Sequence, residues 1–304
     1  MEIPVIQTSN LSFSFNSSGR TLDKINLVVP QGSIFGFLGP NGAGKTTTLR
    51  LLLGLLRKQQ GTIEIFGKEL NRNRIPILKR IGSLIEQPSL YLHLTATENL
   101  EIYRRVYGCT KDRIRTVLDI VGLGNTGTKK AKQFSLGMKQ RLSIAVALLH
   151  QPELLILDEP VNGLDPSGII ETRELIRMLN KEHNTTVLVS SHILNEVERM
   201  ATHVGIIHKG ALLFQGTLSD LHHLKKEQAC LEIETSDNAK ASALLQELFP
   251  VQQKKGKILV PAQSQEKTAA INRMLLQKDI DVYSLHQQQN DLEQLFIDIT
   301  SNHQ

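Results

Sequence analysis

The 304-residue sequence predicts an α/β core built on a parallel sheet, followed by a small α+β domain. Three observations support this prediction. A glycine-rich octapeptide, GPNGAGKT, joins a strand-like apolar run to a helical pattern; a second apolar run, LLILDEP, ends in carboxylates; and an alternating pattern, QACLEIET, starts at Gln228 after a polar helical segment. Short apolar runs that are separated by helical patterns are typical of strands buried on both faces of a parallel sheet.

The octapeptide, Gly39 to Thr46, matches the phosphate-binding pattern G-x-x-x-x-G-K-[ST] at every fixed position. Its glycines let backbone N–H groups turn toward a phosphate, and the next helix adds its positive N-terminal end. The strand GSIFGFL before it and the helix KTTTLRLLLGLL after it favour this interpretation over an incidental turn. We expect Lys45 at the β- and γ-phosphates of a nucleoside triphosphate, and the Thr46 hydroxyl on Mg²⁺. The predicted nucleotide contacts are Gly39, Pro40, Asn41, Gly42, Ala43, Gly44, Lys45, Thr46 and Thr47.

A pair of carboxylates ends the second apolar run. Leu154 to Leu157 indicate a buried parallel strand, which would carry Asp158 and Glu159 out at its C-terminal edge. There Asp158 would hold Mg²⁺ through water, and Glu159 would polarise the attacking water. Adjacent carboxylates at a strand end are otherwise an ordinary solvated turn, but a phosphate-binding loop in the same chain favours the catalytic interpretation.

The segment FSLGMKQRL, Phe134 to Leu142, resembles the signature segment LSGGQQQR of ATP-binding cassette (ABC) ATPases. The resemblance implies that Ser135 and Gly137 contact ATP. It also implies a P-loop core that combines a parallel sheet with an antiparallel β subdomain and a helical subdomain. Further matches follow in the family's order: Gly163, Leu164 and Asp165 fit the D-loop, His192 fits the switch histidine, and Phe15 fits the aromatic residue that stacks on adenine.

Several of these residues also have simpler interpretations. His192 alone could start a helix or lie in a core, but it follows the strand TTVLVSS where the family has its histidine. Phe15 alternates with Phe13, so both could be core residues. Asp165 precedes a proline and suits a helix start, and Ser135 suits an N-cap. Neither cap excludes a contact with phosphate.

Two departures from the family pattern stand out. Leu136 replaces one signature glycine, although backbone N–H groups could still bind phosphate there. At the Q-loop, alignment of IGSLIEQPSLYLHLTATENL with the common IGYVPQEPALYPHLTVREN places Glu86 where the family has a catalytic and metal-contacting glutamine. A slip of one residue would place Gln87 there instead. A carboxylate at Glu86 would add negative charge beside Mg²⁺ and alter the affinity for the metal.

The resemblance implies a shared ATP site between two ATPase subunits that meet head to tail. ATP held by Lys45 and Thr46 of one copy would touch Ser135 of the other. Because the chain has one set of motifs, a homodimer or a heterodimer with a related subunit is required. Glu159 would act as the general base, and His192 would contact the γ-phosphate. Closing and reopening of the dimer would drive a separate polytopic membrane permease.

Composition agrees with a chain that reaches the membrane through that permease. No apolar run approaches the ~18 residues that cross a bilayer, and the start MEIPVIQTSN has no signal-peptide pattern. We therefore expect a cytoplasmic chain, peripheral on the inner face of the cell membrane. Cys109 and Cys230 lie far apart and suggest neither disulfide nor zinc. The net charge of +5 comes without a basic tract, so no direct nucleic-acid partner is expected.

The chain divides in the prediction into an ATP-binding domain, residues 1–220, and an accessory domain, residues 221–304. At the boundary the polar segment SDLHHLKKEQ is helical in pattern. The alternating strand QACLEIET follows, and then helix, two strands, helix and strand, an order that resembles a ferredoxin-like unit. A final helix is predicted from Asp291. It would place Leu292, Leu295, Phe296 and Ile299 on one stripe.

An ABC exporter subunit is the favoured function. Glu86 together with the SLGMKQR segment resembles the ATPase subunits of bacitracin-type and lantibiotic exporters, which implies efflux of a peptide antibiotic or self-protection against one. Two other classes stay open. The chain could be a soluble ABC ATPase acting on ribosomes or DNA, although it lacks the tandem cassettes or long coiled coils common there, or it could energise an importer.

Overall fold

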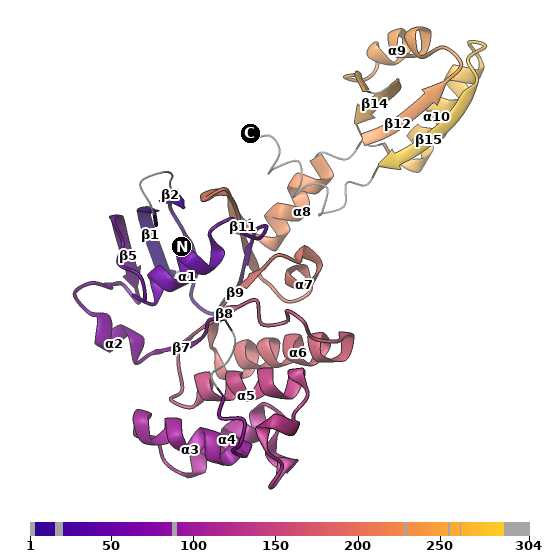
Figure 1. The fold of residues 1–304 in the computed structure, drawn as a ribbon. Coiled ribbons are helices and arrows are strands. Elements are labelled where there is room, and N and C mark those ends of the chain that lie inside the picture. Colours follow the sequence, from indigo (N-terminus) through magenta and orange to yellow (C-terminus); the bar gives the residue numbers. More distant parts are fainter. Residues whose placement is uncertain are drawn as a thin grey trace. The chain divides into compact units, whose positions relative to one another are not determined.

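The structure is a computed structural model that describes residues 4–15, 21–86, 90–227, 230–254, 256–261 and 263–288. It divides into two compact units, Met1–Leu218 and Ser219–Gln304. The ribbon in Figure 1 labels the elements of both units. Each unit is treated by itself below.

A six-stranded sheet organises the first unit, with the order β11-β10-β4-β9-β8-β7. Five of its strands are mutually parallel, and the edge strand β11 alone runs antiparallel, to β10. Strands β4, β8 and β9 are buried at every position, which agrees with apolar sequences covered on both faces. The strands are β4 (Ile34–Leu38), β7 (Ile81–Leu84), β8 (Leu154–Asp158), β9 (Thr186–Ser191), β10 (His203–His208) and β11 (Ala211–Thr217).

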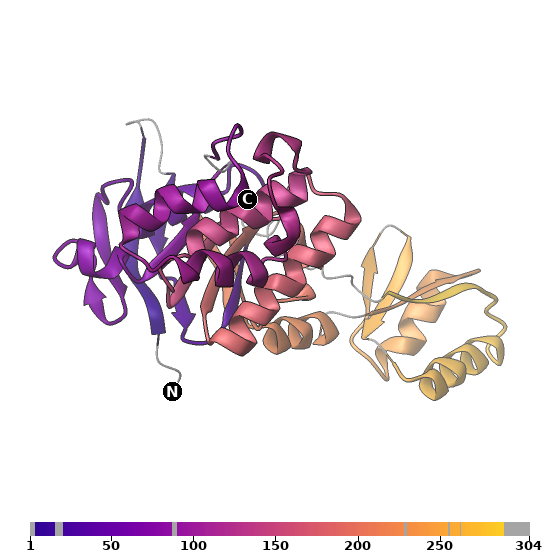
Figure 2. The ribbon, with the colours of Figure 1, turned by 90° about the horizontal axis from the view of Figure 1, so that it is seen from below.

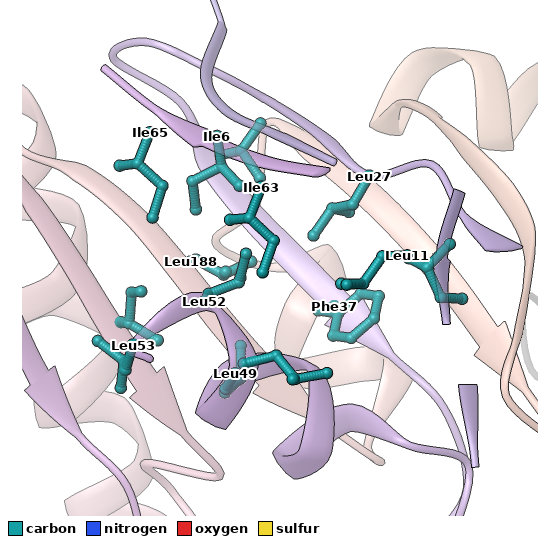
Figure 3. Packing of buried hydrophobic residues seen from close by; sticks show 14 of the residues in the cluster. Ile6, Leu11, Leu27, Phe37, Leu49, Leu52, Leu53, Ile63, Ile65 and Leu188 are labelled. Carbon is teal, nitrogen blue, oxygen red and sulfur yellow. The ribbon is translucent and has the colours of Figure 1, made fainter. Parts of the chain in front are cut away.

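A second sheet, entirely antiparallel, packs against helix α1 (Lys45–Leu52). Figure 3 shows how Ile6 and Ile63 of this sheet meet Leu49 of α1 and Phe37 of β4 in one core. These side chains are at most 2% exposed, and burying each contributes roughly 1.5–3 kcal/mol. The strands of this sheet are β1 (Pro4–Phe13), β2 (Leu22–Ile25), β3 (Val28–Pro30), β5 (Gln60–Ile65) and β6 (Lys68–Glu69).

The remaining helices of the first unit include a subdomain in which α3, α4 and α5 contact one another. Both ribbon views show these three helices side by side (Figures 1 and 2). Helix α3 begins at a capping box between Thr95 and Glu98 and ends at Gly108, which adopts a left-handed φ of 69°. The helices are α2 (Arg74–Leu78), α3 (Ala96–Tyr107), α4 (Asp112–Ile120), α5 (Leu136–Leu148), α6 (Pro166–His183) and α7 (Leu194–Glu198), with 3₁₀ turns at Gly124–Thr126 and Ala131–Gln133.

The second unit has the strand order β13-β14-β12-β15, and every pair in it is antiparallel. Together with the chain order of strands and helices, this is the ferredoxin-like arrangement that the sequence predicts. Leu231 and Ile233 of β12 are buried, while Ala229 and the helix predicted from Asp291 lie outside the described residues. The elements are β12 (Cys230–Thr235), α9 (Asn238–Gln246), β13 (Gln252–Lys254), β14 (Lys257–Pro261), α10 (Gln265–Leu276) and β15 (Val282–Gln288).

Helix α8 (Leu218–Glu227) follows β11 and, from Ser219 on, belongs to the second unit. Among the helices within the described ranges, none has the length and apolar character needed to span a bilayer.

Candidate nucleotide site

The glycine-rich loop connects β4 to the start of α1, as the phosphate-binding mechanism requires. Gly44 has a φ of 110°, and a Cβ there would lie 2.5 Å from Leu22 Cδ2. A Cβ on Gly39 would lie 2.4 Å from the carbonyl oxygen of Ile207. Glycine is therefore required at Gly39 by the close approach of backbone, and at Gly44 by the left-handed backbone conformation.

A cavity of about 310 Å³ opens over this loop. Lys45 is only 6% exposed, and its ammonium donates hydrogen bonds to the carbonyl oxygens of Gly39, at 2.7 Å, and Pro40, at 3.3 Å. The same ammonium lies 3.2 Å from Glu159 Oε1. A buried cation thus faces the cavity beside a carboxylate. The lining residues are Thr21, Asn41, Gly42, Gly44, Lys45, Thr46, Thr47 and Glu159.

Two oxygen ligands meet at the start of α1. The Thr46 hydroxyl donates a hydrogen bond to Asp158 Oδ2 at 2.8 Å, and Asp158 is 7% exposed. Its other oxygen, Oδ1, accepts a hydrogen bond from the Ser190 hydroxyl. Asp158 is the last residue of β8 rather than a residue beyond the strand. The carboxylate is therefore held from both sides by hydroxyl groups.

Glu159 follows β8 in a left-handed conformation, with a φ of 48°. Its amide donates to the Ser190 carbonyl at 3.2 Å and to the Ser190 hydroxyl at 3.0 Å, which holds a conformation that glutamate rarely adopts. Glu159 Oε2 lies 2.8 Å from His192 Nδ1. The two side chains meet because β9, which leads to His192, lies between β4 and β8 in the sheet.

The residues of the signature segment lie on other elements than those that line the cavity. Ser135 caps α5 by accepting a hydrogen bond from the Met138 amide at 3.2 Å, and Leu136 is 53% exposed. Asp165 caps α6 by accepting one from the Gly168 amide at 3.0 Å. The two helix starts adjoin, because a Cβ on Gly137 would lie 3.8 Å from Gly168 Cα. Both cap interpretations from the sequence thus hold in the fold.

The signature segment also adjoins the D-loop. Gly163 has a φ of 76°, and a Cβ there would lie 3.4 Å from Leu136 Cδ2. Leu164 is half-buried within the same turn. Leu136, the departure from the usual glycine, therefore lies against the exposed Gly163 of its own chain.

Two of the predicted contacts, Glu86 and Phe15, are not among the residues that line the cavity. Glu86, with a φ of 62°, forms an ion pair with Arg50 of α1, and its side chain is 63% exposed. Gln87 lies outside the described residues, so the assignment of the Q-loop position stays a prediction. Phe15 is 57% exposed and contacts the buried Phe13 edge-on, with ring centroids 4.9 Å apart. Strand β1 ends at Phe13, so only that ring belongs to the core.

Sequence reasoning missed two residues at the site, Ser190 and Thr21. Ser190 is fully buried in β9 and bonds both Asp158 and Glu159, and Thr21 lines the cavity. A signal for Ser190 did exist, because the apolar run Val187 to Val189 gives way to two serines, Ser190 and Ser191, just before His192. Thr21 carries no such signal, since its position depends on a long-range approach of the antiparallel sheet.

Comparisons with known proteins identify the family. The family described as ABC transporter matches residues 22–162. The bacitracin transport ATP-binding protein BcrA of Bacillus licheniformis is 46% identical over 299 residues, which cover 96% of each chain. This chain belongs to the ABC transporter ATP-binding proteins. As a member of that family it binds ATP and is an ATPase.

Two further ABC proteins support the assignment. The lantibiotic transport ATP-binding protein SrtF of Streptococcus pyogenes is 44% identical over 212 residues, covering 69% of this chain and 90% of SrtF. A solved dimeric ATP-binding cassette in a post-hydrolysis state, bound to ADP and Pi, matches with a TM-score of 0.63 and 25% identity. That match covers 70% of this chain and 98% of the solved one. The predicted ABC fold is thereby confirmed.

Proposed function

We propose that this ABC ATPase energises the export of a peptide antibiotic of the bacitracin or lantibiotic kind through a separate polytopic permease. The observation that supports it most strongly is the similarity to BcrA, which extends over 96% of both chains and so includes the second unit. SrtF, a lantibiotic transport protein, matches over the shorter share of 69%. The permease would hold the chain at the inner face of the cell membrane, with the chain itself in the cytoplasm.

Binding of ATP would use the loop between β4 and α1. Its backbone amides and the Lys45 ammonium would hold the phosphates, since a buried cation with several donors suits the β- and γ-phosphates. A phosphate would compete with the Gly39 and Pro40 carbonyls for that ammonium. Phe15 is exposed beside the core residue Phe13, which supports stacking of its ring on adenine.

The Thr46 hydroxyl and the Asp158 carboxylate fit Mg²⁺, because they are hard oxygen donors placed 2.8 Å apart. Mg²⁺ bound there would neutralise charge on the phosphates. Glu86 would join these ligands only after leaving its ion pair with Arg50.

Glu159 would act as the general base on the attacking water. Its carboxylate is 20% exposed at the cavity and is fixed by Lys45 on one oxygen and His192 on the other. These two contacts would fix the orientation of the Glu159 carboxylate, so that a remaining lone pair could accept a proton from the attacking water. His192 would contact the γ-phosphate. General-base assistance of this kind contributes typically ~10² to 10⁴-fold in rate.

A second ATPase subunit would complete the site. Ser135, Gly137 and Asp165 lie at helix starts, where amides and positive helix ends favour a phosphate. The lining of the cavity comes from other elements. We propose that these residues contact ATP held by a second copy of this chain or by a related subunit.

The experiment that tests this function is purification of the tagged chain from gently solubilised native membranes, followed by mass spectrometry. A stoichiometric polytopic permease is the expected result. Co-expression of that permease with this chain should then raise resistance to bacitracin in a sensitive host, and the Glu159→Gln chain should not. Ribosomal proteins in place of a permease would favour the soluble class, and an external binding protein would favour an importer.

A further inference from the structure

The tight turn between β10 and β11, made by Lys209 and Gly210, lies beside the nucleotide cavity although no family motif includes it. Both residues have positive φ, 46° and 77°. Lys209 is exposed and Gly210 is buried. A buried left-handed glycine in the turn between two strands indicates a close approach of backbone to backbone.

Gly210 makes two backbone hydrogen bonds that lead in different directions. Its amide donates to the carbonyl oxygen of Ala43, within the phosphate-binding loop, at 3.0 Å. Its own carbonyl oxygen accepts from the Asp23 amide at 2.8 Å. One peptide segment therefore bonds the phosphate-binding loop and the antiparallel sheet at once.

These two partners belong to two separate segments, each of which contributes residues to the lining of the cavity. The first, here the phosphate wall, comprises Ala43 to Thr46. The second, here the strand wall, comprises Thr21 to Asp23 and begins with a residue that lines the cavity. The walls also touch directly, because a Cβ on Gly44 would lie 2.5 Å from Leu22 Cδ2 and 3.3 Å from the Thr21 carbonyl oxygen.

The contact at Gly210 leaves no room for a side chain. A Cβ there would lie 2.4 Å from the carbonyl oxygen of Thr21 and 3.2 Å from Leu22 Cα. Both obstacles are backbone atoms, so the strand wall itself would have to shift. Such a shift would change the spacing between the strand wall and the phosphate wall.

We propose that Gly210 is a positioning residue that fixes the strand wall against the phosphate wall, and so sets the fit of a nucleotide that spans both. This inference rests on the proposed nucleotide site. The affinity of a ligand that contacts both walls depends on the distance between them, whereas inorganic tripolyphosphate contacts the phosphate wall alone. A change in that distance should therefore weaken the binding of ATP more than the binding of tripolyphosphate.

The test measures binding of ATP and of inorganic tripolyphosphate, each with Mg²⁺, by displacement of a fluorescent nucleotide from the full chain. Gly210→Ala is expected to raise the Kd for ATP about tenfold, the scale of one or two ligand hydrogen bonds, and that for tripolyphosphate by less than about threefold. The matched control is Gly67→Ala. Gly67 has a φ of 68°, but a Cβ there would meet nothing within 4 Å, so it shares the backbone strain and lacks the collision.

Three results would overturn the inference. Gly210→Ala could bind ATP as tightly as the original chain, it could lose both ligands equally, or Gly67→Ala could lose ATP equally. An original chain that binds neither ligand would instead contradict the proposed site, and this inference with it.

A second measurement needs no variant, in case Gly210→Ala does not fold. Hydrogen exchange of the full chain should show that ATP slows exchange at the Gly210 and Asp23 amides, which are the donors of the two hydrogen bonds that Gly210 makes. Tripolyphosphate should slow exchange at the phosphate wall with a smaller effect at Asp23. Unchanged exchange at both donors with ATP would contradict the inference.

Discussion

Two regions of the first unit carry the residues that resemble the ABC motifs, and they differ in how far one chain completes them. In the first, Lys45, Thr46, Asp158, Glu159 and His192 bond one another around the cavity. In the second, Ser135 and Asp165 bond only as helix caps, and Leu136 is more than half exposed. The first region is therefore preorganised within one chain, whereas the second presents donors outward.

This difference teaches how the catalytic centre is divided. A bonded network fixes the base and the lysine before any ligand arrives, so it can supply both binding and chemistry. Capped helix starts whose residues do not line the cavity of their own chain are suited to an anion held elsewhere. Substitutions at Glu159, Ser135 and Ser190 each change one of the two regions, and a matched control for each tests whether its effect is specific to that site.

The largest effect is expected from Glu159→Gln. The amide keeps the size of the side chain but cannot accept a proton, so turnover should fall by ~10² to 10⁴-fold while ATP binding persists. The variant should also accumulate as an ATP-bound dimer, measured by light scattering after size exclusion. Glu153→Gln is the matched control, because Glu153 precedes the same strand and pairs with Arg80 outside the site. Unimpaired turnover in Glu159→Gln would contradict the assignment of the base.

Ser135→Ala should have the next largest effect and should act on the other region. ATP binding to the single chain should be retained, while ATP-dependent dimer formation and turnover should fall by roughly tenfold, the worth of a lost charge-assisted hydrogen bond. The control is Ser264→Ala, which removes an equivalent cap from α10. Both variants lose about 1 kcal/mol of stability through the cap. Equal activities in the two variants would show that Ser135 acts only as a cap.

Ser190→Ala should weaken the preorganised region from within. It removes the hydroxyl that bonds the Asp158 carboxylate and the Glu159 amide, and a buried acceptor left unpaired costs about 1–3 kcal/mol. We expect kcat to fall by about tenfold with a smaller change in KM, because the base loses its orientation. Ser143→Ala removes an equally buried hydroxyl that bonds only the Lys139 carbonyl. If Ser143→Ala lost as much activity, the effect of Ser190→Ala would come from the loss of a buried hydroxyl in general and not from the orientation of the base.

The smallest effect concerns pH and lies in neither region. Burial lowers the pKa of His150, whose ring stacks on Tyr107 and whose Nε2 lies 3.0 Å from the Ile81 carbonyl oxygen. The unfolded chain therefore binds the proton more readily. The free energy of unfolding should be unaffected by this group above pH 6.5 and should decrease as pH falls below it, by at most about 1.4 kcal/mol per pH unit.

Chemical denaturation at several pH values measures that slope. His150→Phe should lose it while keeping the ring stack, and ATP affinity at pH 7.5 should be unchanged in the variant. A slope that persists in His150→Phe would assign the acid sensitivity to another group.

Motifs made of neighbouring residues were predictable from the sequence. The loop from Gly39 to Thr46 needs only local spacing, and strand β8 needs only a short apolar run. The second unit's order also followed from periodicity. Residues 74–149, in contrast, have a largely helical pattern in the sequence, but β7 interrupts them, and its four-residue run is too short to distinguish from a helix segment.

Contacts between segments that are distant in the sequence could not be predicted from it, and the reason is physical. Ser190 meets Asp158 because β9 lies beside β8, and Gly210 meets Ala43 because β10 lies beside β4. Strand order is set by the packing of the whole sheet, so no local pattern encodes it. The exposure of Leu136 likewise depends on how α5 adjoins α6.

The central claim is that the two regions serve one ATP site from two copies of the chain. Mixing Lys45→Ala chains with Ser135→Arg chains tests it most directly, because each variant breaks a different region. Half of the random dimers then contain one site with both regions intact, so ATPase activity should recover to about a quarter of the original, in line with the symmetry of a two-fold dimer. A mixture no more active than either variant alone would contradict the claim.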